Sequence, residues 1–276
     1  MYTEITENGI LLREPENFDP FVSCECGQCF RFEENGDEVT IYARRRKLRV
    51  KKCGDGYLFE GVSKEEFDGV WYDYFDLGRD YAAIIESFSG DGHISRAAKY
   101  GGGIRIFRQD PWETLVSLII SQNNNIPRIK KIINSLCVLL GEDLGGGNFV
   151  FPAPKAIAEA GVDGLAPIRA GFRAKYIYDA ALKTLSGEVS PERIKNSSYE
   201  EALAELKKIK GVGDKVANCV LLFGYGFTCA FPVDVWVKRV IAEYYGEGFD
   251  PASLGEYAGI AQQYLFYYRR NVVGER

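Results

Sequence analysis

Histidine is almost missing from this sequence, in which His93 is the single histidine among 276 residues. Imidazole is a common zinc ligand and the usual base of a serine nucleophile, so this scarcity argues against a histidine-based metal site and a Ser-His-Asp triad. The seven cysteines are irregularly spaced. Cys24, Cys26 and Cys29 lack a convincing fourth ligand, so we expect reduced thiols and no metal.

Long hydrophobic runs are also absent. No segment approaches the roughly 20 apolar residues that a membrane-spanning helix needs, and the first ten residues lack the pattern of a signal peptide. The net charge of −5 argues weakly against a nucleic-acid partner, although a local basic patch matters more than the total. The one dense basic run, Arg44–Lys52, fits a solvated strand edge at least as well as a DNA contact.

The turn signals in the sequence divide it into two parts. Short apolar segments up to about residue 62 are separated by Asn35-Gly36-Asp37 and Gly54-Asp55-Gly56, a pattern typical of β-strands. A helical pattern begins at Ser63, and three consecutive glycines from Gly101 mark a break. We therefore predict an α+β protein, with an N-terminal antiparallel β-sheet domain with helices at residues 1–105 and an all-helical domain at residues 106–276.

Helix signals are clear in the second part. Asp110 precedes a proline and a glutamate in the order of an N-terminal helix cap, which predicts a helix to about Ile120. Pro127 opens another helix that Gly141 closes, and the three glycines at residues 145–147 mark a flexible break. The last helix is expected to span about residues 252–270.

The most informative stretch is Leu206–Asp234. Gly211-Val212-Gly213 lies between two segments with helical apolar spacing, which predicts a helix, a tight turn and a second helix. Backbone N–H groups at such a turn form a natural phosphate site. Lys215 falls in the first turn of the second helix, and Asp234 follows Pro232. Taken singly, Lys215 would be a solvated helix residue and Asp234 a helix N-cap.

Together, these residues resemble the helix-hairpin-helix DNA glycosylases of the HhH-GPD superfamily, and most closely the 8-oxoguanine DNA glycosylases. Four further segments, in the same order as in that family, extend the resemblance over most of the chain. They are Cys26–Phe32, which resembles G-Q-x-F-R-W; Asp110-Pro111 with Ser121–Ile126 and Arg128, which resemble D-P and NNN-I-x-R; Gly171–Tyr176, which resembles G-[YF]-R-A-x-Y; and Gln262 with Phe266.

The resemblance implies a bifunctional DNA glycosylase/AP lyase of base excision repair. An enzyme of this kind extrudes the damaged base from the duplex before acting on it. Lys215 would attack C1′, expel 8-oxoguanine and form a Schiff base, from which β-elimination cleaves the strand. Asp234 would stabilise the positive charge that develops on the sugar and assist proton transfer. No metal or organic cofactor is required.

The resemblance also assigns the pocket for the base. The lesion carries a hydrogen on N7 where guanine has a lone pair, so the carbonyl of Gly27 would accept from the lesion and repel guanine. Phe266 and Cys219 would sandwich the purine, and Gln262, one helical turn before Phe266, would bind its Watson–Crick edge. Phe266 and Cys219 also fit plain core positions.

Contacts to the rest of the duplex complete the implied site. Asn123 would fill the hole that the flipped base leaves; the alternative is that it is a turn or cap residue. Arg128 and Arg173 would donate to the orphaned cytosine; the alternative for each is a surface ion pair. The same resemblance places Phe172 near the orphaned base and Gly211 and Gly213 at the phosphate-binding turn. The expected partner is double-stranded DNA with 8-oxoguanine opposite cytosine. We expect a monomer, located in the cytoplasm or nucleoid of a prokaryote or the nucleus of a eukaryote.

Some residues depart from the family pattern. Lys210 stands where the hairpin commonly has proline, so the turn is less pre-organised. Trp236 replaces a histidine and puts one phosphate contact in doubt, Phe32 replaces the usual tryptophan, and Phe172 lacks the hydroxyl of tyrosine. The last cysteine, Cys229, precedes Asp234, so the iron–sulfur cluster of some relatives should be absent.

Two other functions fit part of the pattern. One is a glycosylase for another lesion, such as adenine opposite 8-oxoguanine or an oxidised pyrimidine; the Gly27 motif and the lack of C-terminal cysteines argue against it. The other is a non-catalytic helix-hairpin-helix DNA-binding protein, against which Lys215 together with Asp234 argues.

Overall fold

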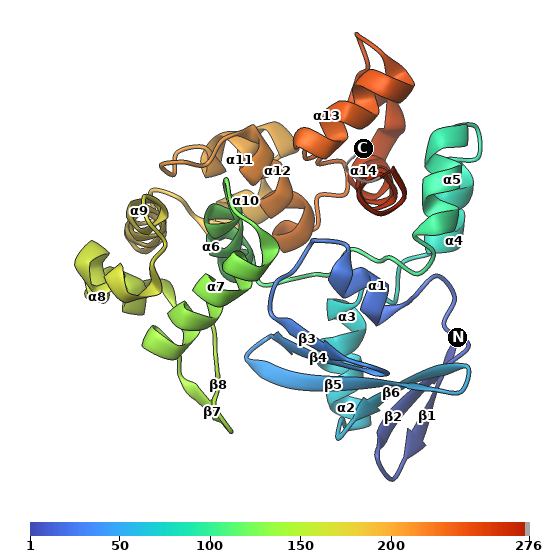
Figure 1. Cartoon of the computed structure of the whole chain (residues 1–276), viewed down its shortest axis with the longest axis horizontal. Coiled ribbons are helices and arrows are strands. Elements are labelled where there is room, and N and C mark those ends of the chain that lie inside the picture. The colour runs from blue at the N-terminus through green and yellow to red at the C-terminus, as the bar shows by residue number, and fades with distance from the viewer. Residues whose placement is uncertain (274–276) are drawn as a thin grey trace. The chain divides into compact units, whose positions relative to one another are not determined.

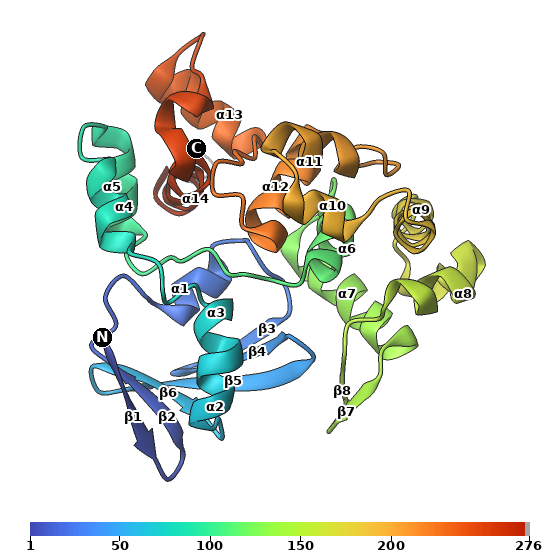
Figure 2. The same cartoon turned by 180° about the vertical axis from the view of Figure 1, so that it is seen from behind.

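The computed structural model describes residues 1–273, which form two compact units built from several chain segments. The first unit contains Met1–Ile41, Leu48–Arg108 and the chain from Gly226 onwards; the second contains Tyr42–Lys47 and Gln109–Tyr225. Figures 1 and 2 show the elements of both. This division follows contacts in space, and the boundary near residue 105 along the chain stays a prediction. None of the described helices combines the length and apolar character needed to cross a membrane.

The N-terminal part forms a six-stranded sheet, as the turn signals predicted. Its order is β1-β2-β6-β5-β4-β3, and the pairs β1–β2, β2–β6, β6–β5 and β4–β3 are antiparallel. Short turns join β1 to β2, β3 to β4 and β5 to β6, as antiparallel pairing permits. The strands are β1 (Tyr2–Thr6), β2 (Gly9–Arg13), β3 (Phe32–Asn35), β4 (Glu38–Ala43), β5 (Arg46–Cys53) and β6 (Gly56–Glu60).

The basic run Arg44–Lys52 lies mostly on β5, between β6 and β4. It is therefore an interior strand, and the expectation of a strand edge is wrong. Leu48 and Val50 alternate with the basic residues and are buried, as expected for a strand with one face in the core. On the other face Lys51 Nζ lies 3.0 Å from Glu60 Oε1, so part of the positive charge is already compensated.

Short helices cover the sheet. Asp19 is the N-cap of helix α1 (Pro20–Glu25). Ser63 is the N-cap of α2 (Lys64–Glu66), and its hydroxyl accepts from the Glu66 N–H at 3.1 Å. The π-helical turn η1 (Phe67–Trp71) and α3 (Tyr72–Tyr74) continue α2 across one face of the sheet (Figure 2). Phe67 of η1 and Phe59 of β6 lie edge to face, with ring centroids 4.9 Å apart. Such buried aromatic pairs fix the helix against the strands.

The remaining helices of the first unit come from residues 81–100 and from the described residues after 234. Helix α14 packs against α5 (Figures 1 and 2). The prediction of one helix over residues 252–270 is wrong at its start, because Gly255 has φ +71° and ψ −152° and interrupts the α-helix. The elements are α4 (Tyr81–Ser87), α5 (Gly92–Tyr100), α13 (Val235–Val240), the π turns η4 (Ile241–Tyr245) and η6 (Arg269–Val273), the 3-10 segment η5 (Pro251–Tyr257) and α14 (Ala258–Tyr268).

Residues 109–225 of the second unit are helical, with one small hairpin. Asp110 and Asn125 cap α6 and α7 by accepting from N–H groups three residues on, at 2.9 and 3.0 Å. The predicted break at residues 145–147 is a hairpin: Gly145 ends β7, and Gly146 and Gly147 form the turn to β8. The elements are α6 (Pro111–Ser121), α7 (Ile126–Leu140), β7 (Asp143–Gly145), β8 (Asn148–Phe149), α8 (Pro154–Gly164), η2 (Ala166–Ile168), α9 (Arg173–Ser186), α10 (Pro191–Asn196), α11 (Tyr199–Leu206), α12 (Asp214–Val220) and η3 (Leu221–Tyr225).

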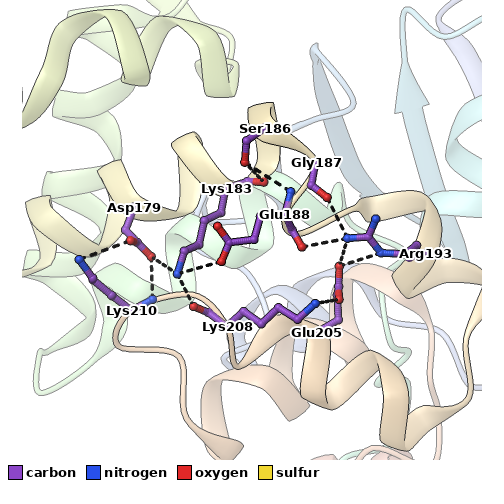
Figure 3. Close-up of polar contacts among 9 residues, drawn as sticks. All are labelled: Asp179, Lys183, Ser186, Gly187, Glu188, Arg193, Glu205, Lys208 and Lys210. Atoms are coloured by element: carbon purple, nitrogen blue, oxygen red, sulfur yellow. Dashed lines mark hydrogen bonds and ion pairs between the residues drawn. The ribbon is translucent and has the colours of Figure 1, made fainter.

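A buried carboxylate joins α10 to α11 in this unit. Glu205 accepts from Arg193 Nη2 and from Lys208 Nζ, both at 2.6 Å (Figure 3). It also accepts from the Ser190 N–H at 3.0 Å. Burial alone would raise its pKa, but the hydrogen bonds from Lys208, Ser190 and Arg193 outweigh burial and lower the pKa to about 2.

We expect Glu205→Gln to lower the free energy of unfolding at pH 7 by about 1–3 kcal/mol, because charged donors lose their acceptor. The folded-state pKa lies below the unfolded one, so this contribution is present above about pH 4.5 and disappears as the pH falls towards 2. Urea unfolding of both proteins at pH 7 and pH 3 measures the difference. Glu200→Gln, on the exposed face of the same helix, is the control. An equal difference at both pH values would contradict the assignment.

Candidate functional site

The predicted hairpin is present in the second unit. Helix α11 ends at Leu206, and α12 begins at Asp214 after a turn that contains the two glycines. Gly211 has φ +78°, and a Cβ there would overlap the ring of Tyr176. Gly213 is the N-cap of α12 and offers no side chain to the first N–H groups of the helix. The turn therefore exposes backbone donors where an anion would bind.

Lys215, the expected nucleophile, and Cys219, expected to contact the base, both lie on α12. Lys215 is half-buried and makes no ion pair with a described residue; Lys207 takes the nearby carboxylate of Asp214, at 2.6 Å. Cys219 follows one helical turn later and is 5% exposed. The spacing of four residues puts both side chains on one helix face, as the sequence predicted.

Asp234 belongs to the first unit, where it is the N-cap of α13. Its Oδ1 accepts from the Val237 N–H at 2.8 Å, so the cap expected from the sequence is present. Its other carboxylate oxygen accepts no hydrogen bond from a described residue. The cap fixes the orientation of the carboxylate and leaves one oxygen available for chemistry.

Gly27 and Phe266 meet in the first unit. Gly27 has φ +90°, and a Cβ at this position would lie 3.3 Å from both Phe266 Cε1 and Arg270 Nη1. The Arg270 guanidinium lies over the Phe266 ring, 5.4 Å from its centroid, and donates to the Glu25 carbonyl at 2.6 Å. The backbone of Gly27 is thus open to a ring plane because it carries no side chain. Arg270 could not be singled out from the sequence alone.

The amide side chains around Gly27 have two different roles. Gln262 is 4% exposed, and its Oε1 is buried without a hydrogen-bond partner among the described residues. The adjacent Gln263 donates to the Cys26 carbonyl at 2.5 Å and ties α14 to the segment before Gly27. An unsatisfied buried acceptor costs about 1–3 kcal/mol, so Gln262 is the amide suited to bind a ligand.

The side chain of Gln28 also holds the segment around Gly27 in place. Its Nε2 donates to the carbonyls of Ser23 and Arg105, both at 2.8 Å, and its Oε1 accepts from the Phe107 N–H at 2.7 Å. The side chain is 2% exposed. In the sequence, Gln28 stood out only as part of a motif. Its hydrogen bonds to Ser23, Arg105 and Phe107 show that it links the segment around Gly27 to residues 105–107.

The cysteines near this segment are buried thiols. Burial raises the pKa of Cys26 to about 12, so the thiol stays neutral at physiological pH. It donates to the Ser23 carbonyl at 3.1 Å. Within residues 1–273, no three His, Cys, Asp or Glu side chains are grouped to hold a metal ion.

Arg173 shapes the loop that carries Asn123. Its buried guanidinium donates to the carbonyls of Gln122, of Asn123 at 2.9 Å and of Ala170 at 3.2 Å. Asn123 is exposed with φ +47°, a conformation that asparagine tolerates better than most residues. Arg173 therefore holds the loop in place besides any contact it makes to a base.

An uncompensated positive surface surrounds this loop. Arg128 is exposed, and neither Arg128 nor Arg173 makes an ion pair with a described residue, so the surface ion pairs considered as an alternative are not formed. Burial lowers the pKa of Arg173, and the charge of Arg128 lowers it further. Phe172 is 50% exposed, with the Arg173 guanidinium 4.5 Å from its ring centroid. The exposed cation Arg128 and the exposed ring of Phe172 suit a nucleic acid, whose phosphates and bases bind such groups.

Comparisons with known proteins identify relatives of the whole chain. The family model of the 8-oxoguanine DNA glycosylase N-terminal domain matches residues 10–115, and that of the HhH-GPD superfamily of base excision DNA repair proteins matches residues 116–253.

Two curated relatives and one solved structure illustrate the similarity. An N-glycosylase/DNA lyase of Saccharomyces cerevisiae is 37% identical over 153 residues, which are 50% of this chain and 41% of that protein. The N-glycosylase/DNA lyase OGG1 of Arabidopsis thaliana is 32% identical over 87% of this chain and 74% of its own length. The crystal structure of the Clostridium acetobutylicum 8-oxoguanine glycosylase/lyase, in complex with dsDNA containing cytosine opposite to 8-oxoG, has a TM-score of 0.91 at 37% identity and covers 98% of each chain.

The two hairpin glycines should differ in their tolerance of a side chain. We expect Gly211→Ala to destabilise the protein by more than about 2 kcal/mol, because a left-handed alanine is strained and its Cβ overlaps Tyr176. Gly213→Ala should keep the melting temperature, since no heavy atom lies within 4 Å of the added Cβ and φ is not positive there. Thermal unfolding of both variants makes the comparison; equal destabilisation would contradict the hairpin geometry.

Proposed function

The chain belongs to the HhH-GPD superfamily of base excision DNA repair proteins, with an 8-oxoguanine DNA glycosylase N-terminal domain, and we propose that it is a bifunctional DNA glycosylase/AP lyase that excises 8-oxoguanine. One observation carries the proposal. A glycine with an open backbone, the ring of Phe266 and the unpartnered oxygen of Gln262 come together in one unit, and the other unit presents Lys215 just after the hairpin.

Recognition of the base would rest on the first unit. The Gly27 carbonyl would accept the hydrogen that the lesion carries on N7, and Phe266 would stack on the purine face. Gln262 Oε1, buried and without a protein donor, would accept from N–H groups on the Watson–Crick edge. Guanine presents an acceptor at N7 and would leave the carbonyl unsatisfied, at a cost of about 1–3 kcal/mol.

Excision requires an amine and a carboxylate at the same sugar. The neutral amine of Lys215 would attack C1′, the bond from C1′ to the base breaks, and the base leaves with the bonding electrons and takes up a proton. The nitrogen then loses a proton, the C1′–O4′ bond of the sugar opens and O4′ takes up a proton, which gives the Schiff base. Loss of the C2′ proton from this Schiff base eliminates the 3′ phosphate. Asp234 would stabilise the positive charge of the sugar through the oxygen that does not cap α13.

The opposite strand would be read by the second unit. Asn123, held in place by Arg173, would enter the space of the extruded base, while Arg128 and the remaining donor of Arg173 would reach the orphaned cytosine. Gly211 and Gly213 would present backbone donors to a phosphate. A monomeric state and a location with the cellular DNA are part of the same proposal.

Trapping with borohydride tests the reaction. We expect the protein to form a covalent adduct with a duplex that contains 8-oxoguanine opposite cytosine, because borohydride reduces a Schiff base. Lys215→Gln should abolish both the adduct and base release, yet still bind lesion DNA. The measurements are single-turnover base release and an electrophoretic shift; normal base release by Lys215→Gln would contradict the mechanism.

The opposite base should matter through Arg128. We expect the native protein to favour cytosine over the other bases opposite the lesion, and Arg128→Ala to reduce that preference about tenfold, since a good side chain–base contact discriminates by about 1–3 kcal/mol. Lys131→Ala, an exposed cation on the same helix, should lower affinity for all four duplexes alike. Excision rates that are equal for all four bases in the native protein would show that Arg128 does not read the partner.

A further inference from the structure

The hairpin turn of the second unit is held by a carboxylate from a different helix. Asp179, in the middle of α9, accepts from the Lys210 N–H at 2.8 Å (Figure 3). Its side chain is 13% exposed. The ammonium groups of Lys183 and Lys210 lie 3.3 and 3.8 Å from its oxygens, so its charge is compensated. The Asp179 carboxylate is therefore bound by the Lys210 N–H and by two ammonium groups.

The Lys210 N–H needs this acceptor because it lies in the turn immediately before Gly211, outside both helices of the hairpin. A proline at this position would carry no N–H and would restrict φ by itself. Lysine keeps the N–H and leaves φ unrestricted. Besides the bond from the Val212 N–H to the Ile209 carbonyl at 3.1 Å, the turn therefore needs an acceptor for the Lys210 N–H. Asp179 supplies that group from α9.

Three side chains of α9, three or four residues apart, contact the turn. The Tyr176 ring covers Gly211, Asp179 binds the N–H of Lys210, and Lys183 Nζ donates to the Lys208 carbonyl at 2.5 Å. Spacings of three and four residues place all three on one face of the helix. The first residue of α9 is Arg173, which holds the loop with Asn123. One helix therefore connects the loop and the hairpin turn.

We propose that Asp179 is a positioning residue for DNA binding: it sets the hairpin turn in the conformation that presents backbone N–H groups to a phosphate, in place of a turn proline. The inference rests on the proposed function, because it takes the turn to be a phosphate site. Asp179 touches neither the base nor the sugar and acts through the Lys210 N–H.

The test compares binding of a duplex with a tetrahydrofuran abasic-site analogue opposite cytosine. Asp179→Ala should weaken binding about tenfold, the effect of removing a hydrogen bond to a charged group. It should raise KM for 8-oxoguanine DNA and leave kcat at saturating DNA nearly unchanged. Asp179→Asn keeps an oxygen acceptor and should stay within about threefold of the native affinity.

Two variants of Lys210 separate the N–H from the ammonium group. Lys210→Ala removes the exposed ammonium group but keeps the N–H, and should lose much less affinity than Asp179→Ala. In the double variant Asp179→Ala with Lys210→Pro, the N–H that needs an acceptor is gone, so binding should recover. A role confined to general stability would lower the melting temperature of Asp179→Ala, and adding proline would not restore its affinity for DNA.

The outcomes decide the inference independently of activity. Native affinity in Asp179→Ala, equal losses in Lys210→Ala and Asp179→Ala, or no recovery in the double variant would each overturn it. If Asp179→Ala does not fold, the amide of Lys210 is followed by hydrogen exchange in the native protein and in Asp179→Asn; an unprotected amide in the native protein overturns it as well. Failure of the native protein to excise 8-oxoguanine would refute the proposed function alone, since the binding and exchange comparisons need no turnover.

Discussion

Satisfying the backbone polar groups of short connections is the constraint on which the rest of this structure depends. Helices and strands satisfy their own backbone groups, but the segments that would meet DNA are turns and loops, in which each buried carbonyl or N–H needs a partner. Here long polar side chains provide the partners. Gln28 and Gln263 bind the segment around Gly27, Arg173 binds the carbonyls before and at Asn123, and Asp179 binds the N–H before Gly211. The candidate DNA contacts at Gly27, Asn123 and Gly211 are thus each supported by a side chain from another segment.

Where no protein group satisfies a polar atom, the structure offers a place for a ligand. Gln262 and Gln263 are neighbours on α14 and equally buried, yet only Gln263 has a partner for its amide. The start of α12 likewise has a glycine rather than a capping side chain, whereas Asp110, Asn125 and Asp234 cap theirs. The buried Gln262 Oε1 lowers stability unless a base supplies its partner. The start of α12 is exposed, and its N–H groups are open to a phosphate.

Local patterns predicted the elements and motifs well. They failed where a glycine adopts an unusual backbone conformation and where a contact joins distant segments. The caps at Ser63, Asp110 and Asp234 could be recognised because the capping residue and its partner are three residues apart. The start of the last helix was wrong because Gly255 gives no sign in the sequence that its φ is positive. The link from Asp179 to Lys210 spans 31 residues, so no periodicity or turn rule reveals it. A departure from a motif, lysine in place of proline, was the only local sign that the turn needed support.

The acidic net charge is compatible with a DNA partner once the charges are assigned to their contacts. Glu205, Asp179 and Glu60 each bind cations of their own unit, so their negative charge is largely compensated. Arg128 and Arg173 have no such carboxylate. Since surface potential near a phosphate depends on the charges within about 10 Å at ordinary salt, the unpaired arginines count for more there than the total of −5. Carboxylates that hold the scaffold can therefore be numerous without weakening attraction for the backbone of a duplex, provided they stay paired.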